Sequence, residues 1–239
     1  MEKNTDNTEI DIHKFETLTK VDFNSLEDAF EAHAGLSFEK QLIFGDIIGD
    51  NGWQLDLGKE SILFGELEFP IQVIGSLSFN SNSWMWGWAN TQSGIPESLL
   101  VQSNKLKEIG EEKNIKELID GHFNVEEGFE HKMGMLASGV FNSKSYYSAN
   151  YGQGTLIVTI DDNKVPAINK TELEKVLTCF PQLISAITVD HKKAFKNYLI
   201  DRDFKLYTTD TKIKGLKDGK IITAEFDDLG RLESLSAKL

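Results

Sequence analysis

The sequence predicts an α+β fold in which an antiparallel sheet packs against several helices. Apolar and polar residues alternate over Trp53–Asn90, as on strands with one buried face, whereas apolar residues recur every three or four positions before and after that range. The predicted strands also stand next to one another instead of alternating with helices. This order suits an α+β chain better than a parallel βαβ sheet.

The composition is that of a globular protein. The chain has 239 residues, of which 40% are hydrophobic and 26% charged, and it has one cysteine, Cys179. A single cysteine excludes an internal disulfide, a redox Cys-x-x-Cys pair and a thiolate metal cluster. No segment approaches the ~20 apolar residues that span a bilayer, and the polar N-terminus lacks signal-peptide features, so a cytoplasmic protein is expected.

The first predicted helix covers about residues 25–48. Apolar residues recur there at helical spacing, and Gly35 is expected to interrupt the helix. The turn-forming residues 49–52, Gly-Asp-Asn-Gly, end it. Residues 1–11 are polar and acidic and are expected to form a disordered tail.

An antiparallel meander of about four strands is predicted over Trp53–Asn90. Turn residues interrupt the alternating pattern three times within this range. The four predicted strands cover about 53–57, 61–64, 68–79 and 83–90.

The last strand of the meander, Ser83–Asn90, contains three tryptophans that share one face, because alternate side chains of a strand point the same way. The strand before it also has one apolar face, so a loop of even length brings the two faces together. A two- or four-residue loop then predicts the pairs Phe79 with Trp84, Leu77 with Trp86, and Gly75 with Trp88, with the indole of Trp88 covering Gly75.

Helices are predicted to dominate the middle of the chain. One begins at Pro96, because proline is favoured at the first helical position, and ends at Gly110. It is followed by a short helix at about 115–119, a longer helix at 126–141 and, after the Tyr- and Ser-rich segment 143–154, an apolar strand at 155–160.

The loop at 161–168 is the predicted boundary between a main domain over 12–160 and a helix-and-hairpin subdomain over 161–239. The subdomain is expected to pack on the main domain, and one undivided domain fits the pattern as well.

Two helices and a hairpin region are predicted in that last segment. Asn169 and Asp190 can each cap a helix, and Pro181 is expected to kink or split the first one. Two Gly-containing turns flank a strand over 221–226 and give the C-terminal hairpin region.

The meander resembles a known family. Gly49-Asp50, Trp53, Asp56, the strand around Gly75 and above all Ser83–Asn90 are similar to the bacterial domain-of-unknown-function family 6882. The similarity runs from about residue 36 to 110 and more weakly to 146–147, and the turn at 226–231 is similar to the family's ending. The resemblance implies a bacterial source and brings no known chemistry with it.

The sequence contains no recognised catalytic motif. It has no Gly-x-Ser-x-Gly elbow, Walker loop, His-Glu-x-x-His motif or Rossmann fingerprint, so neither a catalytic residue nor a cofactor is predicted. The densest cluster of potential metal ligands favours a solvated helix face over a metal site, because one exposed helix does not make ligands converge. Its members are His122, Glu126, Glu127, Glu130 and His131.

Aromatic residues supply the candidate binding site. Three indoles on one sheet face favour a packed core, with a stacking platform for a ligand as the alternative. The segment Ser143–Gly154 combines tyrosines with small polar residues, a composition suited to adaptable contacts, or it is a strand-edge loop. The candidate binding residues are Trp84, Trp86, Trp88, Asn90, Tyr146, Tyr147 and Tyr151.

The charge favours a basic protein as partner. With 38 acidic and 25 basic residues, the net charge of −13 disfavours binding to nucleic acid or to an anionic membrane. The basic group Lys192, Lys193 and Lys196 is more typical of a solvated helix face. The preferred hypothesis is a non-enzymatic protein-binding protein, of which an immunity or antitoxin type that neutralises a basic toxin is an example. The alternative is a small-molecule binder or unrecognised enzyme with a Trp/Tyr-lined groove.

Overall fold

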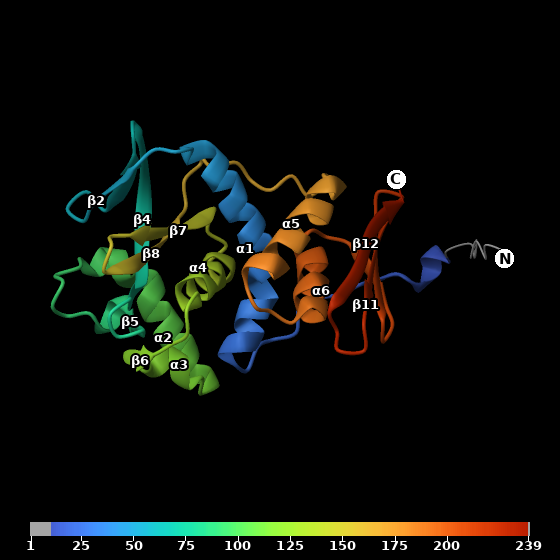
Figure 1. The fold of residues 1–239 in the computed structure, drawn as a ribbon, viewed down its shortest axis with the longest axis horizontal. Helices are drawn as coiled ribbons and strands as arrows, with labels where there is room; N and C mark the ends of the chain where they lie inside the picture. Colours follow the sequence, from blue (N-terminus) through green and yellow to red (C-terminus); the bar gives the residue numbers. More distant parts are fainter. Residues whose placement is uncertain (1–10, 239) are drawn as a thin grey trace.

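The fold consists of two antiparallel sheets with two layers of helices between them, which confirms the α+β prediction (Figure 1). The computed structural model describes residues 11–238, so the predicted tail lies almost entirely outside the described residues. The helices are α1 (Leu26–Ile48), α2 (Val101–Lys113), α3 (Lys116–Ile119), α4 (Phe129–Val140), α5 (Leu173–Ala186) and α6 (His191–Asp201), with short 3-10 turns η1 (Ile12–Lys14), η2 (Gly87–Ala89) and η3 (Glu97–Leu100).

One sheet has seven strands and the other has five. The seven-stranded sheet contains β2 (Trp53–Asp56), β3 (Ser61–Phe64), β4 (Leu67–Ser78), β5 (Ser83–Trp86), β6 (His122–Asn124), β7 (Ser145–Asn150) and β8 (Gly154–Ile160). The five-stranded sheet contains β1 (Glu16–Thr17), β9 (Lys205–Thr208), β10 (Lys212–Lys217), β11 (Lys220–Phe226) and β12 (Leu232–Lys238). Helices α1 and α4 pack against the first sheet, and α5 and α6 lie between α1 and the second.

The predicted meander is confirmed as β2-β3-β4-β5, and its long strand β4 holds the sheet together. One edge of β4 pairs with β3 near its start and with β5 near its end, while β8 pairs along the other edge. Between β3 and β5 that edge has no strand partner, and the start of α2 fills the gap. There Ser103 Oγ donates to Ile74 O at 3.1 Å and accepts the Trp88 N–H at 3.2 Å.

The tryptophan hairpin has the predicted even loop, but its pairing differs by two residues. Ser78 pairs with Ser83 across a four-residue loop, so Leu77 lies opposite Trp84 and Gly75 opposite Trp86. A shift of two residues keeps Trp84 and Trp86 on the same face as Leu77 and Gly75, because the period of a strand is two. The three predicted pairs, Phe79 with Trp84, Leu77 with Trp86 and Gly75 with Trp88, are therefore wrong. The predicted single apolar face of the long strand is wrong in its first half. A register irregularity between Val73 and Gly75 divides the strand, so Leu77 packs with Trp84 and Trp86, whereas Phe69, Ile71 and Val73 pack in the other core cluster.

Two further details of the hairpin correct the prediction. The strand ends at Trp86, since Gly87–Ala89 turns away as η2, so Ser83–Asn90 is not one continuous strand. Gly75 is covered by the ring of Trp84, not by Trp88, and a Cβ at residue 75 would overlap that ring. Glycine is thus required where the indole of Trp84 packs directly against the backbone of β4.

Helix α1 is continuous through Gly35, so the predicted interruption is wrong. The glycine serves a close approach, since a Cβ there would overlap the ring of Tyr198 on α6. Helix α5 also continues through Pro181, although a kink or split was predicted. Asp190 caps α6 as predicted, because its carboxylate accepts the Lys193 N–H at 2.9 Å.

The C-terminal hairpin region is confirmed as β10 and β11, joined by a two-residue turn. Asp218 and Gly219 both have positive φ, at 50° and 78°, as a tight hairpin turn requires. This sheet packs its apolar face on α6, where Phe195 meets Phe226 at 6.2 Å between ring centroids. The division of the chain into 12–160 and 161–239 stays a prediction.

A buried ion pair joins α1 to α6. Arg202 has no exposed surface, and its Nη1 atom donates to both carboxylate oxygens of Glu39, at 2.6 and 2.5 Å. Tyr198 donates to the same carboxylate at 2.6 Å, and the second guanidinium nitrogen reaches the carbonyl oxygens of Asn169 and Glu172. Such a pair needs both partners, because either charge alone would be buried without compensation.

We expect Arg202→Ala or Glu39→Ala to lower the free energy of unfolding by about 3–5 kcal/mol, since each leaves one uncompensated buried charge. The double replacement with Met should cost much less than the sum of the single changes. Urea unfolding measures these values. The control is Lys105→Ala, which breaks an exposed ion pair and should leave the free energy of unfolding nearly unchanged. If the loss of unfolding free energy in the double variant equals the sum of the losses in the two single variants, the buried-pair interpretation is contradicted.

Gly35→Ala should destabilise the protein, because the new methyl group overlaps Tyr198. Gly45→Ala in the same helix is the matched control, since no atom lies within 4 Å of a Cβ there. Alanine favours a helix over glycine by up to about 1 kcal/mol, so the control should raise the free energy of unfolding. Thermal and urea unfolding measure whether each change lowers or raises the free energy of unfolding. If both changes stabilise the protein, α1 and α6 are not in close contact at Gly35.

Candidate functional site

The hairpin places two of the candidate binding residues inside the protein. Trp84 and Trp86 have no exposed surface, and their rings meet edge to face with 5.4 Å between centroids. Trp86 Nε1 donates to Glu117 O at 2.9 Å. Within residues 11–238, nothing accepts from the buried Nε1 of Trp84. These two indoles pack the sheet against its helices and leave no aromatic face open to a ligand.

Trp88 and Asn90 lie beyond the strand and are partly exposed. The ammonium of Lys107 lies over the Trp88 ring, 4.6 Å from its centroid, so the indole already has a cationic partner. The Asn90 side chain accepts the Ser93 N–H at 3.2 Å, as in a turn.

The three candidate tyrosines lie in three different environments. Tyr146 is buried against Gly134 of α4, whereas Tyr147 is on the opposite sheet face and meets Phe64 at 4.7 Å between centroids. Tyr151 is 52% exposed in the loop before β8. The seven candidate residues therefore do not line one groove, because neighbouring residues of β7 point to opposite faces.

A cluster of titratable side chains joins the N-terminal segment to α1 and α6. Lys20 Nζ bonds Asp201 at 2.7 Å and lies 3.4 Å from His33 Nδ1. Nearby, Lys40 Nζ donates to Ser143 O at 2.8 Å. No sequence motif indicates this cluster, because its members come from three distant segments of the chain.

Burial dominates the pKa values in this cluster. Burial, followed by the positive charges of Lys20 and Lys40, lowers the pKa of His33 to about 3, so its imidazole is neutral at pH 7. Burial likewise lowers the pKa of Lys40 to about 8 and raises the pKa of Asp201. Perturbed groups of this kind mark functional sites or internal ion pairs. Here they contact one another and the chain, which favours internal ion pairs.

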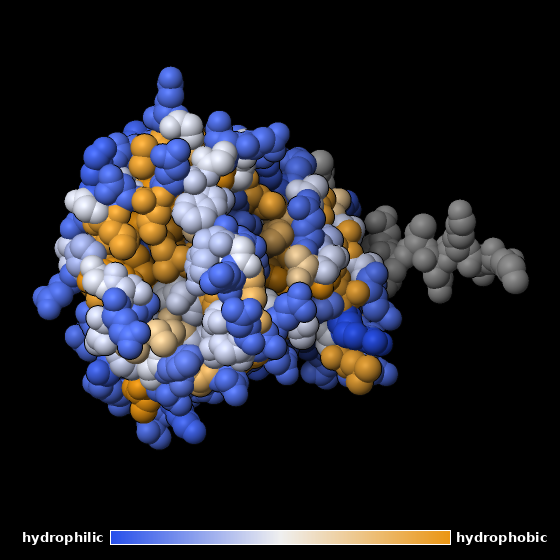
Figure 2. All heavy atoms as spheres, turned by 60° about the vertical axis from the view of Figure 1, so that its left-hand side comes forward, coloured by the Kyte–Doolittle hydropathy of each residue, from blue (hydrophilic) through white to orange (hydrophobic). Residues whose placement is uncertain are grey.

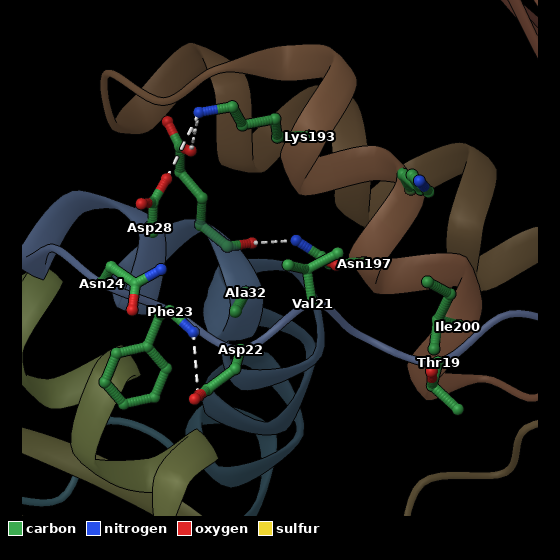
Figure 3. A pocket seen from close by; sticks show the side chains of 12 residues that line it. Thr19, Val21, Asp22, Phe23, Asn24, Asp28, Ala32, Lys193, Asn197 and Ile200 are labelled. Atoms are coloured by element: carbon green, nitrogen blue, oxygen red, sulfur yellow. Dashed lines mark hydrogen bonds and ion pairs between the residues drawn. The ribbon is translucent and has the colours of Figure 1, made fainter. Parts of the chain in front are cut away.

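The pocket in Figure 3 lies beside this cluster, between residues 19–24, α1 and α6. It encloses about 310 Å³. Three of its charged groups form ion pairs: Lys193 Nζ lies 3.4 Å from Asp28 and 3.3 Å from Glu31. Asn197 donates to Glu31 O (Figure 3). The cluster residues Lys20, His33, Lys40 and Asp201 are not among those that line the pocket. It is a gap between packed elements in which the charges of Lys193, Asp28 and Glu31 are paired with one another.

A partly exposed apolar surface lies on the outer side of the seven-stranded sheet. Phe44 and Ile48 of α1 pack there against Phe64 and Phe69, but they cover only part of the face. Around them remain half-buried residues that we call the apolar sheet face: Ile47, Trp53, Leu55, Leu57, Leu67, Ile95, Leu100, Tyr147 and Leu156. Figure 2 shows apolar side chains gathered on this strand-rich side, with hydrophilic side chains around them.

The chain segment that supplies most of the apolar sheet face is rich in carboxylates. The range 41–100, which supplies most of its residues, contains seven acidic residues and one lysine. All of these carboxylates are exposed except Asp56, which is partly exposed. By contrast, the range 190–220 contains nine basic and five acidic residues. An apolar centre with a charged rim is the anatomy of a protein-binding surface.

Within residues 11–238, no group of three or more His, Cys, Asp or Glu side chains is arranged to hold a metal ion. The predicted cluster on 122–131 is used otherwise: His122 Nε2 lies 2.9 Å from Ser83 Oγ, and His131 Nδ1 lies 3.4 Å from the Tyr146 hydroxyl. Cys179 is buried, and burial raises the pKa of its thiol. None of the helices in the described part of the chain is long and apolar enough to cross a membrane.

Comparison with known proteins identifies a family but no characterised relative. The model of a family of unknown function, DUF6882, matches residues 27–163. No curated protein and no solved structure matches the chain. The match covers more than half of the 239 residues, so the chain belongs to this family. It includes α1 and the whole seven-stranded sheet, and therefore the apolar sheet face.

We expect the free energy of unfolding to fall as the pH is lowered from 7 to 5, and His33→Gln to reduce this fall. The pKa of His33 is about 3 in the folded protein and about 6.5 in the unfolded chain. The contribution of neutral His33 to the free energy of unfolding is therefore fully present above pH 6.5 and decreases as the pH falls below that value. At pH 5 the loss from this group is about 2 kcal/mol. Urea unfolding at several pH values measures it, with the exposed His13→Gln as control. Parallel pH curves for the wild type and His33→Gln would contradict the assignment.

Proposed function

We propose that this DUF6882 protein is a non-enzymatic binding protein whose apolar sheet face receives a basic protein. The observation that carries the proposal is the apolar sheet face itself, which α1 covers only in part and whose chain segment, residues 41–100, contains seven acidic residues and one lysine. A partner that covers this face removes its apolar side chains from water, and the resulting hydrophobic free energy stabilises the complex.

The distribution of charge supports a basic partner. Seven acidic residues against one lysine in the range 41–100 produce a negative field on the side of the molecule that holds the apolar face. Such a field accelerates encounter with a cationic protein and disfavours acidic competitors. A bacterial cytoplasmic protein that neutralises a basic toxin, of the immunity or antitoxin type, is the specific form of this proposal.

The alternative of a small-molecule site or an enzyme in a Trp/Tyr-lined groove has less support. Two of its three tryptophans lie in the core, and the third contacts Lys107. The titratable cluster at His33 is satisfied internally and is not part of the neighbouring 310 Å³ pocket.

We expect Leu57→Asp and Leu67→Asp to abolish capture of a basic partner by the purified protein in an extract of its native host. Each change places a charge among the half-buried residues of the apolar sheet face, where the partner would bury it unpaired. Affinity capture with mass spectrometry measures the result. Val21→Asp is the matched control, because Val21 is 81% exposed but lies at the pocket of Figure 3 and not on this face.

Circular dichroism and thermal unfolding first establish that each variant is folded. Wild type and Val21→Asp should capture the same basic protein, and the interaction should weaken as salt is raised. Recovery of no basic partner, or equal recovery by the Leu57→Asp and Leu67→Asp variants, would contradict the proposal.

A further inference from the structure

A second surface, an open cleft, lies between the loop of the tryptophan hairpin and the start of α4. It encloses about 600 Å³ and is bounded on the hairpin side by Leu77 and Phe79. The Val125 N–H donates to Asn82 O at 2.8 Å and thereby holds the segment before α4 against the hairpin loop. Phe79 is 39% exposed, although it is large and apolar. The cleft is thus walled by apolar side chains on a fixed backbone.

The charge of the cleft is entirely negative. Glu126, Glu127 and Glu130 line it, and no lysine, arginine or histidine is among its lining residues. Lys132, the nearest lysine along the chain, points elsewhere, since its ammonium lies 3.3 Å from Glu27 and over the ring of Phe30. The three carboxylates therefore repel one another without an opposing charge on the cleft wall.

Glu130 differs from its two neighbours in being buried. Its exposed fraction is 8%, and its Oε2 atom is shielded from solvent with no hydrogen-bond partner in residues 11–238. Glu126 and Glu127, in contrast, are exposed. A buried carboxylate oxygen without a partner is costly, so its retention calls for a specific reason. A cation that enters the cleft would supply the missing partner.

The surroundings of Glu130 define the kind of cation. A metal ion would need several converging ligands, and no such group occurs in the described residues. The walls contain Leu77, Phe79 and Val125, which suit an aliphatic stem, while the carboxylates suit its charged end. A volume of about 600 Å³ also accommodates much more than a single ion.

We propose that this cleft binds an aliphatic cation, an ammonium or guanidinium group on an apolar stem, with Glu130 as the buried partner of the charge. The apolar stem lies along Phe79 and Val125, and Glu126 and Glu127 attract the cation from solvent. A lysine or arginine side chain of a protein and a free polyamine share this chemistry. The site is separate from the apolar sheet face and does not depend on the function proposed for it.

Isothermal titration calorimetry with two probes tests this inference: the peptide acetyl-Gly-Arg-Gly-amide and spermidine. The wild type should bind at least one of them at one site per chain, with an affinity that weakens as salt is raised. Binding of the peptide alone indicates a protein ligand, and stronger binding of spermidine indicates a polyamine. The peptide acetyl-Gly-Gln-Gly-amide, which lacks the charge, should not bind.

Glu130→Gln should weaken the binding at least tenfold, because the cation loses its buried counter-charge. The matched control is Glu174→Gln, since Glu174 also lies in the first turn of its helix but is exposed and outside the cleft. Loss of the favourable first-turn charge is then common to both variants.

Thermal unfolding without ligand separates a binding role from a structural one. If Glu130 serves the ligand, Glu130→Gln removes an unpaired buried charge and should unfold at the same or a higher temperature than the wild type. Absence of saturable binding of both probes to the wild type, or equal binding by Glu130→Gln, would overturn the inference. Leu57→Asp should bind the probes normally, so failure here and failure of the apolar sheet face as an interface are distinguishable.

Discussion

The burial of helix α1 on nearly all sides is the constraint on which the rest of the structure depends. The helix packs against α4 and β7 on one side and against α5 and α6 on the other, so it belongs to the interior of both halves of the molecule. A helix in this position must hide polar side chains as well as apolar ones. Each buried polar group therefore needs a partner on a different element.

The partners of those polar groups fix how the elements are placed around α1. Ser37 Oγ donates to Met135 O of α4, Lys40 reaches the loop after α4, and Glu39 pairs with Arg202 beyond α6. Gly35 adds a steric requirement, because only a glycine lets Tyr198 approach the helix this closely. Ionic and steric complementarity together explain why the two sheets occupy defined positions on either side of the helical layers.

This arrangement also determines which surfaces are left for binding. The tryptophan face of the sheet is used internally, because α4 covers it and Phe129 contacts Trp84. The opposite face is covered in part by the end of α1, by Leu99 of η3 and by Val165, and its remaining apolar residues stay partly exposed. The acidic cleft is a third consequence, since the chain that leads into α4 is held against the hairpin loop and turns three glutamates toward it.

Local patterns in the sequence determined the α+β class, the four-stranded meander, the even hairpin loop and the capped start of α6, because side-chain periodicity and turn chemistry act over a few neighbouring residues. Tertiary structure alone decided that Trp84 lies on Gly75, that Gly35 continues a helix and that Trp88 is left partly exposed while Trp84 and Trp86 are buried. Period two shows that residues share a face, but whether a helix covers that face depends on contacts between distant segments. For the same reason the sequence does not predict the unpaired carboxylate of Glu130, because its burial arises only when α4 and the hairpin pack together.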